Sequence, residues 1–347
     1  MTGEDGAVEY RELTRDSSGP ASPDGGLPRL SPKAAWFPRS EPVLHIRRDG
    51  RTFVVDDPVM DFPRVIVFGA RPCDAAAPDI LAPLFGWDYH DTFFEQRRRN
   101  TAFIVIGCTR PVDAACFCTT VGVDPAGEGL GDVLLTPWGD DVFLAEARTE
   151  VGESLLSDVP ADPRQEGEPS AADLEAFRRR VRESMPPRFE VAALRSALAR
   201  RFDDPFWERA ARSCLACGTC AYVCPTCHCF DLQDEMVGSR GLRQKNWDAC
   251  AFPLFTLHTS GHNPRPDQAS RWRQRLSHKF RYYPEKFGRV LCTGCGRCLR
   301  LCPAGMDMLA DLQELAGAPS RDREGAVEER TRPGALPDGG GAEGVGG

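Results

Sequence analysis

Apolar positions in residues 31–158 occur in short runs that polar turns separate. Five of these runs predict β-strands, at 52–55, 65–68, 103–106, 133–135 and 142–145. The second and third runs are continuously apolar, which is typical of strands buried on both faces. Short helices are predicted at 75–84 and 152–156. We therefore expect an N-terminal α/β-type domain over residues 31–158.

A helical pattern begins at residue 170. Ser170 and Asp173 have capping-box spacing, and apolar residues follow them at helical intervals. Further helices are predicted at 191–198, after Asp204-Pro205, at 267–282 and at 306–315. We expect a mainly helical second domain over residues 170–316, and therefore an α+β fold for the chain.

Three segments lack apolar periodicity. Residues 1–30 are polar and rich in Gly, Ser, Asp and Pro, which predicts a disordered leader. Residues 159–169 consist mainly of Asp, Pro, Glu and Gly and predict a linker between the two domains. Residues 317–347 are dominated by Gly, Pro, Asp and Arg and predict a disordered tail.

Two cysteine runs with identical spacing are the main chemical feature. The run from Cys214 to Pro225 reads C-x2-C-x2-C-x3-C-P, and it recurs from Cys292 to Pro303. This is the bacterial ferredoxin pattern for [4Fe–4S] clusters. Three thiolates at this spacing wrap a tight loop around one cluster, and small residues such as Gly218 let backbone N–H groups approach it.

Zinc is the main alternative to iron and sulfur. Structural zinc sites use four ligands, usually two C-x2-C pairs or cysteine with histidine. They need neither a third cysteine at the same step nor a fourth followed by proline. The duplicated pattern therefore favours two [4Fe–4S] clusters over a zinc-dependent interaction module.

The ligands of each cluster follow from the same pattern. In paired runs the fourth cysteine serves the other cluster. One predicted set is Cys214, Cys217, Cys220 and Cys302, and the other is Cys292, Cys295, Cys298 and Cys224. The eight thiolates could also bind without this exchange. The exchange is favoured because each fourth cysteine lies about one helical turn beyond the third and points away from its own loop.

Seven cysteines lie outside the two runs. They are Cys73, Cys108, Cys116, Cys118, Cys227, Cys229 and Cys250. The first four follow predicted strands or turns and could hold a third metal centre. Free cysteine is also a common small core residue, and these spacings match no ligand motif. The sequence leaves both interpretations open, and it equally leaves open whether the last three bind metal.

The second domain also contains histidines and a basic segment. His228 and three other histidines could in principle replace a cysteine ligand, although a hydrogen-bonding role is favoured. Residues 265–281 interleave Arg and Lys with aromatic residues, which suggests nucleic acid as one ligand. We favour the alternatives that these cations offset the negative charge of thiolate-bound clusters or face an acidic partner.

Composition limits the remaining classes of function. The chain has 347 residues and a net charge of −8, which argues against general nucleic-acid binding. No apolar run is long enough to span a bilayer. Fifteen cysteines without a secretory signal indicate a reducing cytoplasm and metal binding rather than disulfides. No catalytic constellation of Ser, His and Asp or of paired carboxylates stands out.

Several further motifs carry a resemblance to a known family. They are SPK at 31–33, FGARPCD at 68–74, CFCT at 116–119, CPTCHCFD at 224–231, WDAC at 247–250, GHN at 261–263 and HKF at 278–280. With the cysteine runs, they make residues 31–312 resemble the beta subunit of soluble multi-subunit [NiFe] hydrogenases, or sulfhydrogenases. The corresponding component of anaerobic sulfite reductase is similar.

The resemblance implies an α-helical ferredoxin-like fold for the second domain and a role in electron transfer. Its implied partners are a flavin-bearing, NAD(P)H-binding subunit and the [NiFe] hydrogenase subunits. One alternative is the corresponding component of an anaerobic sulfite reductase. Another is an oxidoreductase that binds flavin itself, but no G-x-G-x-x-G follows a strand, and the glycines at 127–131 are typical of a turn.

Overall fold

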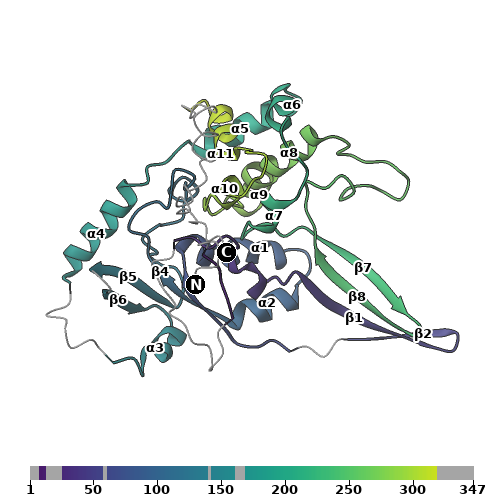
Figure 1. The fold of residues 1–347 in the computed structure, drawn as a ribbon, viewed down its shortest axis with the longest axis horizontal. Helices are drawn as coiled ribbons and strands as arrows, with labels where there is room; N and C mark the ends of the chain where they lie inside the picture. Colours follow the sequence, from purple (N-terminus) through teal and green to yellow (C-terminus); the bar gives the residue numbers. More distant parts are fainter. Residues whose placement is uncertain (1–7, 13–25, 58–60, 140–141, 161–168, 319–347) are drawn as a thin grey trace, which may run out of the picture.

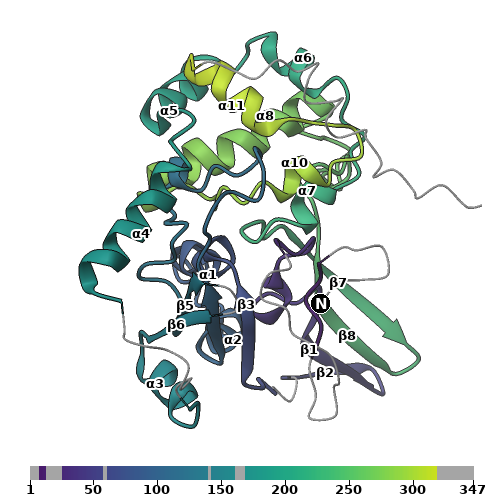
Figure 2. The same ribbon diagram turned by 60° about the vertical axis from the view of Figure 1, so that its left-hand side comes forward.

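The computed structural model describes residues 8–12, 26–57, 61–139, 142–160 and 169–318. Helices occupy one end of the molecule and two sheets the other, and both views place the short helices α7 (Thr219–Tyr222) and α10 (Arg297–Arg300) between them (Figures 1 and 2). The predicted α+β class is therefore confirmed, with the cysteine runs near the junction.

The first sheet contains four of the predicted strands in the order β3-β4-β5-β6. They are β3 (Val65–Ala70), β4 (Thr101–Ile106), β5 (Val133–Gly139) and β6 (Val142–Ala147). The first three are parallel and β6 is antiparallel. Burial of β4 on both faces is confirmed, whereas the same prediction for β3 is wrong, because Ile66 and Phe68 are 53% and 42% exposed.

Three helices accompany this sheet: α1 (Pro72–Phe85), α2 (Thr92–Arg99) and α3 (Glu150–Leu156). The sequence predicted α1 and α3 but not α2, half of whose residues are charged. Asp91 caps α2 by accepting a hydrogen bond from the Phe94 N–H. Short 3₁₀ turns at η1 (Pro32–Ala35) and η2 (Thr119–Val121) complete this part.

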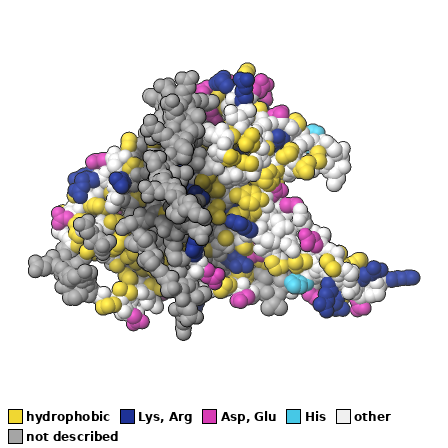
Figure 3. All heavy atoms as spheres, in the orientation of Figure 1, with side chains coloured by type: hydrophobic (Ala, Val, Ile, Leu, Met, Phe, Trp, Pro, Cys, Tyr) yellow, Lys and Arg dark blue, Asp and Glu magenta, His cyan; other side chains and the backbone are white. Residues whose placement is uncertain are grey.

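A second antiparallel sheet has the order β2-β1-β8-β7 and projects from the body as an arm (Figure 1). It joins β1 (Ser40–Asp49) and β2 (Thr52–Asp56) to β7 (Phe230–Val237) and β8 (Arg240–Trp247). The hairpin β7–β8 lies between the two cysteine runs, where the sequence predicted only a helix. Figure 3 shows hydrophobic side chains along the arm and Lys or Arg side chains at its tip.

The helical part follows the predicted apolar spacing. It comprises α4 (Ala171–Glu183), α5 (Val191–Arg200), α6 (Phe206–Ala211), α8 (Gln268–Ser277), α9 (Tyr283–Phe287) and α11 (Met308–Ala316). A π-helical turn, η3 (His278–Tyr282), joins α8 to α9. Trp272, Leu276 and Phe280 all lie in the core of this part, as their spacing predicted.

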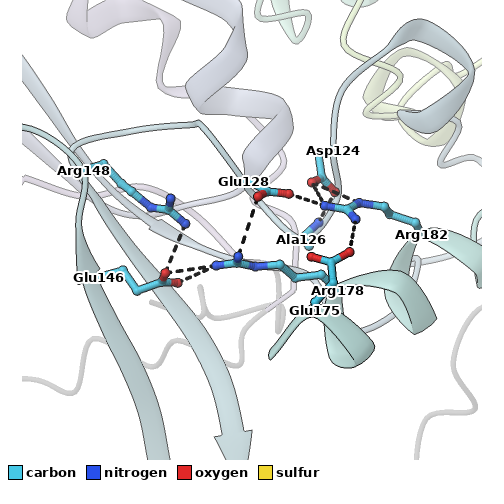
Figure 4. A network of polar contacts seen from close by, with 8 residues as sticks. All are labelled: Asp124, Ala126, Glu128, Glu146, Arg148, Glu175, Arg178 and Arg182. Atoms are coloured by element: carbon cyan, nitrogen blue, oxygen red, sulfur yellow. Dashed lines mark hydrogen bonds and ion pairs between the residues drawn. The ribbon is translucent and has the colours of Figure 1, made fainter. Parts of the chain in front are cut away.

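Helix α4 binds the first sheet through a network of ion pairs (Figure 4). Arg178 contacts Glu146 of β6 at 2.8 Å, and Arg182 contacts Asp124 at 2.9 Å. The sequence pattern assigns this helix to the second domain, beyond a linker at 159–169. Residues 161–168 of that linker lie outside the described residues.

Parts of the predicted leader contact the folded body. The Tyr10 hydroxyl donates a hydrogen bond to Asp74, and the Pro28 carbonyl accepts one from Arg297. Both polar groups therefore contact the buried ion pair that Asp74 forms with Arg297. Residues 1–7 and 13–25, and residues 319–347 of the predicted tail, lie outside the described residues. No helix in the described part of the chain is long and apolar enough to cross a membrane.

Candidate metal centres

The two cysteine runs fold into equivalent loops, each followed by a short helix. Gly218 and Gly296 precede α7 and α10 with φ of 73° and 71°, a left-handed conformation that favours glycine. A side chain at position 296 would also approach the Ala115 carbonyl oxygen to 2.6 Å. Glycine at this point of the run is therefore required by both backbone conformation and packing.

The first cavity brings cysteines of both runs together. Its cysteines are Cys214, Cys217, Cys220, Cys298 and Cys302. The first three belong to the first run, and Cys302 is the fourth cysteine of the second run. Trp272, Met306 and Met308 supply apolar walls. The cavity thus contains the four cysteines predicted for one ligand set, together with Cys298, which was predicted for the other set.

The second cavity has the reciprocal composition. Its cysteines are Cys224, Cys292, Cys295 and Cys298, so the fourth cysteine of the first run meets the first three of the second. Arg275 and Lys279 also line it. Cys298 belongs to both cavities, and the two sites are therefore immediate neighbours.

Several donors point at the cysteine sulfurs. The Gln268 side-chain amide lies 2.9 Å from Cys214 Sγ, the Met306 N–H lies 3.3 Å from Cys302 Sγ, and the Gly294 N–H lies 3.4 Å from Cys292 Sγ. Such hydrogen bonds stabilise negative charge on metal-bound thiolates.

Two buried cations stand between the runs. Lys279 Nζ lies 3.5 Å from Cys224 Sγ, and Arg275 donates to Cys227 Sγ at 3.4 Å and to the Cys220 carbonyl at 2.7 Å. Burial alone would lower the pKa of Lys279, but the neighbouring Cys224 and Cys227 raise it above its ordinary value. These positions support charge compensation as the role of the basic segment.

The alternative that the basic segment faces a partner is wrong for three of its six cationic side chains. Arg271, Arg275 and Lys279 are at most 7% exposed. Arg271 donates to the carbonyls of residues 265 and 266, and Arg273 stacks 3.8 Å above the Phe202 ring. The helix predicted for this segment is confirmed, but Arg271, Arg275 and Lys279 point into the protein and not toward solvent.

The donor set fits iron–sulfur clusters better than single metal ions. Within the described residues, no three His, Cys, Asp or Glu side chains converge closely enough to hold one ion. A multinuclear cluster instead needs thiols spread around a cavity, as here. Burial raises the pKa of Cys220 to about 11 and that of Cys292 to about 12, because it disfavours the negatively charged thiolate. Bound iron supplies the positive charge that stabilises the thiolate form of these ligands.

The remaining cysteines form two groups. Cys227, Cys229 and Cys250 lie beside the first run, where Cys229 and Cys250 share a hydrogen bond that lowers the pKa of Cys250 to about 6. His228, also in this region, has its Nδ1 3.1 Å from the Thr226 carbonyl oxygen, which agrees with a hydrogen-bonding role. The four N-terminal cysteines line a third cavity.

Two residues that support the site were not identified from the sequence. Asp74 forms two hydrogen bonds to Arg297 of the second run, at 2.6 and 2.8 Å, and both side chains are fully buried. Lys33 donates to the carbonyl of Cys227 at 2.9 Å and lies 3.8 Å above the Trp247 ring. Both residues lie in motifs that carried the family resemblance, and these motifs were the sequence signal by which they could have been found.

Two comparisons with known proteins bear on this site. Residues 213–306, which include both cysteine runs, match the family model of the 4Fe-4S dicluster domain. The chain is 29% identical over 290 residues to the sulfhydrogenase 2 subunit beta of Pyrococcus furiosus, and the alignment covers 82% of this chain and 83% of that protein. No solved structure matches the chain.

Proposed function

We propose that this chain, an iron–sulfur electron-transfer protein homologous to a sulfhydrogenase beta subunit, relays electrons between a flavin-bearing, NAD(P)H-binding subunit and a [NiFe] hydrogenase module. The family resemblance that the sequence motifs indicated is confirmed by the homologue and by the dicluster domain. The number of clusters, the partners and a cytoplasmic location are parts of the proposal.

The observation that carries the proposal is the pair of adjoining cavities that share Cys298. Each brings three cysteines of one run together with the fourth of the other, and the first cavity also contains Cys298. We assign Cys214, Cys217, Cys220 and Cys302 to one [4Fe–4S] cluster, and Cys292, Cys295, Cys298 and Cys224 to the other. Two clusters in neighbouring sites form a path along which electrons can move singly.

When bound, such clusters accept and release one electron each. The residues of the chain hold them and adjust their surroundings. Arg275 and Lys279 offset thiolate charge from inside the protein, while the Gln268 amide and the Met306 N–H donate hydrogen bonds to sulfur. Trp272 and neighbouring methionines exclude water from the first cavity.

The local structure speaks against a nucleotide-binding role for the glycine-rich stretch. Gly127 and Gly131 both have positive φ and pack against the first sheet. A side chain at position 131 would approach Val105 Cγ2 to 2.4 Å. Two glycines of this stretch are therefore packed against the sheet as in a tight turn, while Gly129 has open space beside it.

The first prediction concerns activity. We expect the isolated chain to show no hydrogen-dependent or NAD(P)H-dependent dye reduction, because a relay has no site that activates a substrate. Activity should appear when a flavin subunit and a [NiFe] hydrogenase pair are added under anaerobic conditions. Full NAD(P)H-dependent activity of the chain alone would contradict the proposal. Restoration by a sulfite reductase module instead of the hydrogenase pair would favour the alternative complex.

The arm offers a surface that suits a partner subunit. Val55, Ile46, Gly241 and Met236 lie directly opposite one another across the four strands, so they share one face. On this face Phe53, Val55, Leu232 and Met236 are between 44% and 63% exposed. These apolar side chains belong to the two edge strands, and the Asp234–Arg243 ion pair lies on the same face. Exposed apolar side chains next to polar groups are typical of an interaction surface.

We therefore expect Val55→Asp combined with Leu232→Asp to weaken assembly with the partner subunits by about tenfold or more, because two carboxylates would be buried at the interface. Pull-down of the tagged chain measures this. Thr52→Asp with Gln233→Asp adds the same charge to the opposite face and is the matched control. Equal assembly by both variants would exclude this face, and unchanged iron content checks that the clusters remain.

A further inference from the structure

The four N-terminal cysteines, Cys73, Cys108, Cys116 and Cys118, line one cavity although they are spread over the chain. Cys73 follows β3 at the start of α1, and Cys108 follows β4. The carboxyl ends of neighbouring parallel strands meet at the same edge of a sheet, which brings these two together. The loop before η2 supplies Cys116 and Cys118.

The surroundings of these thiols suit a metal cluster. Cys73 and Cys118 are buried, while Cys108 and Cys116 are half-buried. The Arg300 guanidinium donates to Cys116 Sγ at 3.1 Å, and Arg71 and Arg110 line the cavity. Cationic side chains here would offset the charge of four thiolates, as Arg275 and Lys279 do between the two runs.

The third cavity adjoins the second. Cys295 lines both, so the three cavities form a row connected through Cys298 and then Cys295. The Phe117 N–H donates to the Gly294 carbonyl at 2.9 Å. A side chain at Gly294 would meet the Cys118 backbone at 2.5 Å. The cysteine loop of the first domain is thus packed tightly against the second cysteine run.

We propose that Cys73, Cys108, Cys116 and Cys118 bind a third iron–sulfur cluster, placed at the end of the row next to the cluster of the second run. The inference extends the proposed relay and rests on it. Four cysteine thiolates are the ligand set of both [2Fe–2S] and [4Fe–4S] clusters. Binding releases the thiol protons, and transfer moves one electron from a reduced cluster to its oxidised neighbour without making or breaking a bond.

The other three unassigned cysteines fit this role less well. Among the residues that line the three cavities, Cys227, Cys229 and Cys250 do not occur. Cys229 therefore provides a matched control, a partly buried cysteine outside both the two runs and the third cavity.

Iron analysis of the full-length, anaerobically purified chain tests the proposal. We expect about twelve iron atoms per chain for a [4Fe–4S] cluster in the third cavity, or about ten for a [2Fe–2S] cluster. Cys108→Ser with Cys116→Ser should reduce the count to about eight and remove one EPR signal from the reduced protein. Cys229→Ser should leave both unchanged. The half-buried pair is chosen because its replacement disturbs the core least.

Two results would overturn the third cluster: about eight iron atoms in the unmodified chain, or one equivalent of zinc that the double variant loses. The count in the unmodified chain decides the matter even where the variant fails to fold. The variant Cys217→Ser distinguishes failure of the third cluster from failure of the proposed two-cluster relay. If it removes about four iron atoms from a chain with eight, the two-cluster relay stands without the third cluster. If it removes none, the relay fails instead.

Discussion

Replacing Asp74 by alanine is expected to destabilise the folded chain by about 3–5 kcal/mol, because it leaves the buried Arg297 without its counter-charge. Both Asp74 oxygens accept hydrogen bonds from the guanidinium, and the Tyr10 hydroxyl donates a third at 3.1 Å. The pair joins α1 of the first domain to α10 of the second cysteine run, so its loss should also loosen the second cluster site.

Urea titration of the cluster-loaded protein measures this effect, with iron retention as a second readout. Asp79→Ala is the matched control, since Asp79 lies on α1 like Asp74 and pairs with Arg98 of α2, but its side chain is 55% exposed. A surface pair of this kind contributes about 0–1 kcal/mol. Asp74→Leu combined with Arg297→Met should cost less than Asp74→Ala alone, because no uncompensated charge remains. Equal stability of Asp74→Ala and Asp79→Ala would show that the buried pair is not a major contribution.

Replacing Cys224 by serine is expected to remove the cluster of the second run, and Cys302→Ser to remove that of the first. Each change should cost about four iron atoms per chain, because one ligand of four is lost from a cubane. The reason is the crossed composition of the cavities, in which Cys224 meets Cys292 and Cys302 meets Cys214.

Two reference variants identify which cluster is lost. The EPR spectrum of reduced Cys224→Ser should match that of Cys295→Ser, and the spectrum of Cys302→Ser should match that of Cys217→Ser. If Cys224→Ser instead matches Cys217→Ser, each run holds its own cluster and the exchange is wrong. Serine is chosen because it keeps the size and polarity of cysteine while binding iron more weakly.

The arm explains why part of the fold was missed. Strand β7 is exposed at every position, so burial imposes no regular pattern on it, and its apolar and polar residues alternate only in part. Its partner β8 pairs with β1, almost two hundred residues earlier in the chain, at contacts such as Leu44 with Arg243. Pairing over such a distance leaves little local signal in the sequence, and the hairpin between the cysteine runs therefore came only from the tertiary structure.

The basic segment at 265–281 shows that the sequence also does not reveal the surroundings of a charged side chain. Its helical spacing was readable because Trp272, Leu276 and Phe280 repeat at the interval of a helix. Charge alone could not say whether Arg275 and Lys279 face solvent or cysteines, since that depends on what packs against α8 and η3. The structure places them within 3.5 Å of Cys227 and Cys224 sulfurs.

The sequence by itself determined the chemistry of the two cysteine runs, because thiols at steps of three and four residues on one loop define a cluster site locally. It also determined most helices and the strands of the first sheet, whose apolar spacing reflects burial on one or both faces. Only the tertiary structure decided which cysteines share a cavity, that Asp74 pairs with Arg297, and that Cys73, Cys108, Cys116 and Cys118 meet. These residues are brought together by strand order and domain packing, and no spacing along the chain encodes such contacts.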